Sequence, residues 1–157
     1  MAAFLAPASL FAYANSFALV GWALLALAPR RALTRRLVLS GLWPLALAAL
    51  YAAALLAHYA GPAAGAGGFG SLAEVRQLFA TDWALLAGWV HYLCFDLCLG
   101  IWQVHDGRRR GVPHLLLLPG LAFTFLVGPV GLLVYAGVRR VGRRRGTRSV
   151  SAAEPAA

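Results

Sequence analysis

Four long apolar runs, separated by short segments rich in arginine or glycine, constrain this chain more than any other feature. A helix that crosses a bilayer needs about 20 apolar residues, and each run is that long or longer. A soluble domain usually carries about 25% charged residues, whereas this chain of 157 residues has 12% charged and 61% hydrophobic residues. The sequence predicts an all-α membrane protein with about four transmembrane helices, at residues 4–28, 37–59, 83–104 and 113–138.

Residues 1–138 are predicted to form a single membrane-embedded helical domain, and 139–157 an Arg-rich disordered tail. The N-terminal run lacks the basic segment of a signal peptide, so we take it as the first membrane helix. Residues 61–70 are expected to be a flexible linker. Ser71 followed by Glu74 is a capping-box pattern, which predicts a short amphipathic helix at the membrane surface before the third run.

The 14 basic side chains are all arginines, and they gather in clusters at the ends of the apolar runs, giving a net charge of +9. This arrangement favours contact with anionic lipids over nucleic acid binding. If all four runs cross the membrane, the arginines divide equally, with a slight preference for cytoplasmic first and third loops. If residues 113–138 instead form two half-helices that return to one side, the tail joins both arginine loops and the conflict disappears.

Asp96 lies near the middle of the third run, where an ionisable side chain is costly and usually faces the interior of a helix bundle. Trp89, Tyr92 and Gln103 share its helical face, while His91 lies about 140° around the helix. A structural interpretation is a carboxyl that locks two helices together. The functional interpretation, which we prefer, is a general acid, proton relay or ligand contact, because burial favours the neutral carboxyl that can donate a proton.

A second polar cluster follows, in which Asp106 and His114 flank the three arginines at 108–110. Such residues could bind a metal or transfer protons, but they do not form a recognised metal-binding motif. An interfacial charged loop is the structural alternative. Cys94 and Cys98 lie one helical turn apart and are interpreted as small packing residues. The sequence therefore indicates neither a metal nor another cofactor.

The second half of the chain resembles a known family through four stretches: EVRQLF (74–79), GWVHYLCFDLCLGIW (88–102), HDGRRRGVPHLLLLPG (105–120) and LAFTFLVGPVGLLVY (121–135). They are similar to the abscisic-acid-deficient-four-like family of small integral membrane proteins. The similarity covers residues 71–138. The matching positions are His91, Phe95, Asp96, Gly100, Trp102, Asp106, His114, Pro119, Gly128, Pro129 and Gly131. The chain departs from the pattern at Val90, Gly107 and Gly120, and none of these changes removes a polar group.

Plant members of that family sit in plastid membranes and are required for neoxanthin formation, and relatives occur in bacteria. The resemblance implies a role in carotenoid or isoprenoid metabolism, with isomerisation of a 5,6-epoxide to an allene as the candidate reaction. That chemistry needs an acid near the epoxide oxygen and a base near the departing proton. The candidate catalytic residues are Asp96, His91, Asp106 and His114, and the candidate substrate-binding residues are Trp89, Tyr92, Trp102, Gln103 and Arg108.

A non-catalytic membrane scaffold, which holds a lipid or a biosynthetic enzyme, is the alternative function. Under either hypothesis the expected partners are membrane lipids and a carotenoid or other isoprenoid ligand. We expect a multi-pass protein of the bacterial plasma membrane.

Overall fold

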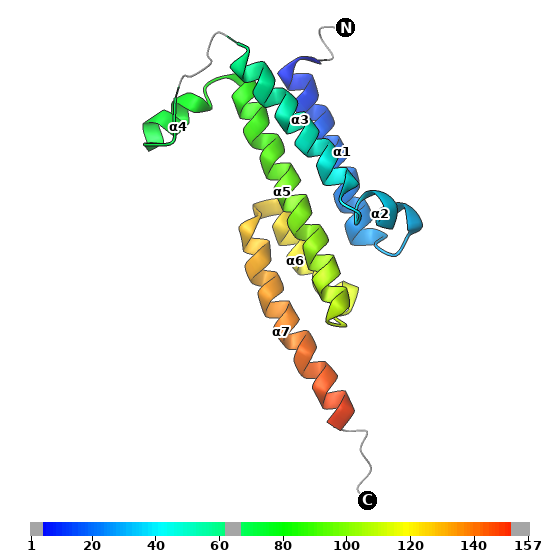
Figure 1. Cartoon of the computed structure of the whole chain (residues 1–157). Helices are drawn as coiled ribbons and strands as arrows, with labels where there is room; N and C mark the ends of the chain where they lie inside the picture. Colours follow the sequence, from blue (N-terminus) through cyan, green and yellow to red (C-terminus); the bar gives the residue numbers. More distant parts are fainter. Residues whose placement is uncertain (1–4, 62–66, 152–157) are drawn as a thin grey trace, which may run out of the picture.

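The computed structural model describes residues 5–61 and 67–151, with side-chain surroundings through residue 140. Every regular element of these residues is a helix, which confirms the all-α prediction (Figure 1). The helices are α1 (Pro7–Leu27), α2 (Ala32–Leu37), α3 (Leu42–Tyr59), α4 (Leu72–Leu78), α5 (Asp82–Arg109), α6 (His114–Val127) and α7 (Pro129–Ser151).

Among the described residues, three helices are long and apolar enough to cross a membrane: α1, α3 and α5. The predicted count of four is therefore not confirmed. The second apolar run begins later than expected, because Gly41 adopts a left-handed conformation (φ 90°) between α2 and α3. Pro44 then falls in the first turn of α3, where a proline is tolerated and need not kink the helix.

Helix α5 is the centre of the bundle and packs against α1, α3, α6 and α7. It has 28 residues, about 42 Å at 1.5 Å per residue. Gly100 allows α1 to approach closely, since a Cβ atom there would come within 2.6 Å of the Trp22 ring. The core of the bundle is built mainly from leucine, valine and alanine of these helices.

The fourth apolar region is two helices, α6 and α7, which form an antiparallel hairpin (Figure 1). Helix α6 has 14 residues, about 21 Å, which is shorter than the hydrocarbon core of a bilayer. The break is at Gly128, with φ 52° and ψ −105°, followed by Pro129. Gly131 packs closely against Thr124 across the hairpin. Of the two arrangements that the sequence left open, the structure therefore has the one in which two helices form a hairpin and return to the same side.

Helix α7 continues to Ser151 and so extends into the segment predicted to be a disordered tail. Arginine is a good helix former, and the segment contains no proline before Pro155. Residues 152–157 lie outside the described residues.

Both arginine loops lie at one end of the molecule, which we call the arginine end, and the hairpin brings the start of the tail to the same end (Figure 1). Arg108 donates to the Pro29 carbonyl at 2.7 Å, and His114 Nε2 lies 2.8 Å from the Ala26 carbonyl. The opposite end carries α4, as predicted. The Ser71 hydroxyl accepts from the Glu74 amide, and the Glu74 carboxylate accepts from the Gly70 amide, a variant of the predicted capping box.

Candidate functional site

The Asp96 side chain is buried inside the bundle, with 9% of its surface exposed. It projects from the middle of α5 toward the tip of the α6–α7 hairpin. Its Oδ2 atom is buried and has no hydrogen-bond partner among the described residues. An unsatisfied buried carboxyl oxygen is uncommon and calls for an explanation. The inward placement predicted from the sequence is therefore observed.

The hairpin tip fits around this carboxyl only because residue 128 is glycine. A Cβ atom at Gly128 would lie 3.0 Å from Asp96 Oδ1 and 3.2 Å from Oδ2. The positive φ of this residue also disfavours any other side chain. Asp96 and Gly128 both match the family pattern, but nothing in the sequence predicts that they are in contact.

Tyr92 and Trp89 extend from Asp96 toward the α4 end of the molecule. Tyr92 lies one turn before Asp96 on the same side of α5. The Trp89 and Tyr92 rings lie 5.5 Å apart, and the Trp89 indole donates to Asn15 Oδ1 at 3.0 Å. The polar amide of Asn15 inside an apolar run is the signal that could have marked this residue in the sequence.

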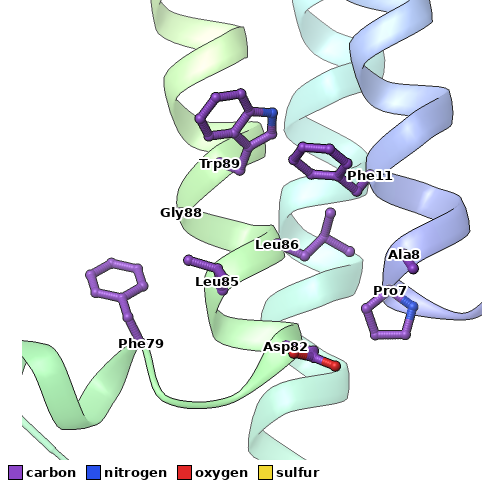
Figure 2. Close-up of a pocket in the computed structure, with 9 residues that line it drawn as sticks. All are labelled: Pro7, Ala8, Phe11, Phe79, Asp82, Leu85, Leu86, Gly88 and Trp89. Atoms are coloured by element: carbon purple, nitrogen blue, oxygen red, sulfur yellow. The ribbon is translucent and has the colours of Figure 1, made fainter.

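Trp89 also lines a pocket of about 540 Å³ between the beginnings of α1 and α5 (Figure 2). Phe79 covers the pocket from the α4 side, and Phe11 faces Trp89 with 5.5 Å between ring centroids. Phe11, Leu85 and Trp89 are 44%, 58% and 39% exposed, so the pocket opens sideways to the surroundings of the bundle. In a membrane that side faces acyl chains, which gives an apolar ligand a direct route in.

Gln103 joins helices and does not face this pocket. It is fully buried, and its amide donates to the Thr124 hydroxyl at 2.8 Å, which in turn donates to the Gly120 carbonyl. Trp102 lies further out, 41% exposed, with its ring edge against Tyr135. These two predicted substrate-binding residues therefore contact the α6–α7 hairpin.

Asp106, His114 and Arg108 all lie at the arginine end. Asp106 Oδ2 accepts from Arg110 and from the Tyr135 hydroxyl, both at 2.7 Å. The Asp106 carboxylate raises the pKa of the Arg110 guanidinium through that hydrogen bond. Asp106 is ten residues beyond Asp96, about 15 Å along the helix, so the structure does not bring this cluster to Asp96.

His91 is also separated from Asp96. Its ring stacks on Phe95 with 4.5 Å between centroids and approaches Tyr51 of α3 at 5.5 Å. It lines a different pocket, on the side of α5 that faces α3 and α4. The four candidate catalytic residues are thus distributed over three places, and the candidate site reduces to Asp96 with Tyr92, Trp89 and Gly128.

No group of three or more histidine, cysteine or acidic side chains that could hold a metal ion is found in the described part of the chain. Cys94 is buried and its thiol donates to the Pro44 carbonyl at 3.3 Å, whereas Cys98 is exposed. This geometry fits the packing role predicted for Cys94.

The comparison with protein families gives one match, to the ABA DEFICIENT 4-like family, over residues 9–135. No curated protein and no solved structure is significantly similar to the chain. The match covers most of the chain, including the first two apolar helices as well as the region that carried the resemblance. This membrane protein, with its buried Asp96 at a hairpin tip, belongs to the ABA DEFICIENT 4-like family.

Proposed function

We propose that the protein acts on a polyene or related isoprenoid lipid within the membrane, as an isomerase-type factor of carotenoid metabolism with Asp96 as its proton donor. The family match supports a membrane protein of the carotenoid and abscisic acid pathway. It gives no support to the bacterial plasma membrane that the sequence led us to expect.

The observation that carries the proposal is the unpartnered Oδ2 atom of Asp96. A carboxyl used only to lock helices would be expected to satisfy both oxygens, because an unpaired buried polar atom costs about 1–3 kcal/mol. Gln103 also has an unpartnered buried oxygen, Oε1, but its amide nitrogen donates to the Thr124 hydroxyl of a neighbouring helix at 2.8 Å. Asp96 Oδ2 faces the hairpin tip and has no such bond within the described part of the chain.

The approach to Asp96 suits a long apolar molecule. The lateral pocket ends at Trp89, seven residues before Asp96, which is about 10 Å along α5. Tyr92 lies between them on the same side of α5, with its ring centroid 5.5 Å from that of Trp89. Aromatic rings offer flat apolar surfaces to a conjugated chain. An end group could reach the carboxyl while the remainder stays in the pocket or in lipid.

The candidate reaction needs no redox cofactor, because it only moves a proton. The Asp96 carboxyl donates its proton to the epoxide oxygen as the carbon–oxygen bond breaks, forming a hydroxyl group. A proton then leaves the adjacent chain carbon, and the electron pair of that carbon–hydrogen bond completes the allene. The Asp96 carboxylate can take up this proton and regenerate the acid. A single carboxyl with both roles agrees with the separation of His91 and His114 from Asp96.

The test compares two Asp-to-Asn substitutions in the same helix, in a host that accumulates a 5,6-epoxy carotenoid. Asp96→Asn keeps the shape of the side chain but removes the acid, and general acid–base catalysis contributes about 10²–10⁴-fold. We expect product per folded molecule to fall at least about 100-fold, measured by chromatography and mass spectrometry of pigments. Asp106→Asn is the matched control and should lower only the amount of folded protein. Unchanged product per folded molecule in Asp96→Asn would contradict the proposal.

A non-catalytic scaffold is the second candidate function, and the low exposure of Asp96 favours it. Under that hypothesis Asp96→Asn and Asp106→Asn act alike, lowering protein level and pathway output together. Purified protein in lipid nanodiscs would then bind the polyene without converting it.

A further inference from the structure

His58 forms a second buried polar site, on the side of α5 away from the hairpin. It lies at the end of α3 and is 4% exposed. Its Nδ1 atom is 3.0 Å from the Thr81 hydroxyl, in the segment that leads into α5. Its Nε2 atom is buried and has no hydrogen-bond partner among the described residues. His58 is not among the candidate site residues that the sequence predicts.

The contacts of Thr81 are compatible with a His58 ring that carries its proton on Nε2. Thr81 is the N-cap of α5, and its oxygen already accepts from the Ala84 amide at 3.3 Å. Its own hydrogen can then be donated to His58 Nδ1, which satisfies both groups. In the neutral ring the proton is then on Nε2. In this tautomer the unpartnered atom is an N–H donor, and the capping residue Thr81 holds the ring.

A pocket of about 370 Å³ lies beside this imidazole, between α3, α4 and α5. Aliphatic and aromatic side chains line most of it, among them Tyr51, Leu55, Phe69, Phe79 and His91. Phe69 is 85% exposed and Tyr59 57% exposed, so the rim is open at the α4 end of the bundle. The site thus combines an apolar wall with a fixed hydrogen-bond donor at the membrane surface.

The charges around the pocket indicate the class of ligand. With the histidines neutral, none of its described lining residues carries a formal charge. A phosphate headgroup would find no cationic partner here, and the arginines of the first and third loops are at the other end of the molecule (Figure 1). A neutral oxygen on a compact apolar end group satisfies both the Nε2–H donor and the apolar walls.

We propose that the pocket beside His58 binds the neutral, oxygen-bearing end group of an isoprenoid lipid, with His58 Nε2–H donating to a hydroxyl or carbonyl oxygen. The inference deepens the proposed function by naming a recognition site separate from Asp96, and it takes from that function only the polyene class of the ligand. Binding at His58 does not require conversion at Asp96, so the two ideas can fail separately.

The experiment measures binding of two probes to the full chain in nanodiscs: a ring-hydroxylated carotenoid and the hydrocarbon carotene of the same length. Induced circular dichroism of the polyene reports binding. His58→Phe removes the donor while keeping a ring, and loss of one hydrogen bond should weaken the hydroxylated probe on the order of tenfold. The hydrocarbon probe should bind His58→Phe and the unmodified protein equally.

Two further variants keep the test decisive. His58→Gln places an amide donor near the position of Nε2 and should restore much of the preference for the hydroxylated probe. His105→Phe changes a histidine at the arginine end, whose Nε2 lies 3.1 Å from the Leu39 carbonyl, and should not alter the preference. If the unmodified protein binds both probes equally, or if His58→Gln folds but shows no preference, the proposal is wrong. A phospholipid that displaces both probes would equally overturn it.

Discussion

The two halves of α5 differ in how their polar side chains are used. After Asp96, the α6–α7 hairpin covers the helix, and Gln103 and Asp106 each bond a side chain of that hairpin. The hairpin does not extend along the part of α5 before Asp96, and the face with Trp89 there borders an open pocket. The unpartnered Oδ2 atom of Asp96 lies at the boundary between the two halves, and a second unpartnered atom, Gln103 Oε1, lies within the covered half. The length of one hairpin therefore determines where α5 bonds to α6 and α7 and where its Trp89 face is left beside a pocket.

The difference between the two halves of α5 requires that the α6–α7 hairpin returns to the arginine end. A topology experiment can test this arrangement. The arginine end carries seven arginines from the first and third loops together with Arg139 and Arg140, and only Arg76 lies in the segments described at the opposite end. The positive-inside rule then places this end in the cytoplasm. Reporters fused after Ala157 and inserted between α2 and α3 should both report cytoplasm, and one inserted before α4 the opposite side. Opposite locations for the first two would mean that residues 113–138 cross the membrane.

The second prediction concerns the contact that divides the two halves. Gly128→Ala introduces a Cβ atom about 3 Å from the Asp96 carboxyl at a positive φ, and such strain costs on the order of 1–3 kcal/mol. We expect a lower free energy of unfolding in detergent and loss of product formation. Gly111→Ala has a positive φ of 66° without a nearby atom, and Gly137→Ala has neither feature.

Those two controls separate backbone strain from contact with the carboxyl. Gly111→Ala should lose stability but keep activity per folded molecule, and Gly137→Ala should change neither by more than about 1 kcal/mol. Equal behaviour of Gly128→Ala and Gly111→Ala would show that the hairpin tip does not position Asp96.

The smallest effect is expected in the covered half of α5. A double-mutant cycle of Gln103→Leu and Thr124→Val should give a coupling free energy of about 0.6 kcal/mol, as is typical between membrane helices. Thermal unfolding in detergent measures it, and product formed per folded molecule should not change. Gln77→Leu on the exposed helix α4 is the matched control, with no expected coupling to Thr124→Val. A loss of catalytic rate in Gln103→Leu would show that Gln103 belongs to the candidate site after all.

Much of this protein follows from the order of its residues. The apolar runs dictate helices in lipid, because only helices and closed barrels satisfy every backbone group there. Ser71 and Glu74 fix the start of α4, and the helical period places Asp96, Tyr92 and Trp89 on one side of α5. Each of these features depends on contacts within a few residues, so a local pattern suffices to predict it.

Only the tertiary structure shows which residues the predicted helix faces contact. The return of α7 toward the arginine end depends on the backbone angles of Gly128, and the sequence was compatible with a kinked helix as well. The contact between Gly128 and Asp96, and the bond between His58 and Thr81, join residues more than 20 positions apart. Helical periodicity gives the direction of a side chain but not the neighbour it finds, because the neighbour is set by how whole helices pack.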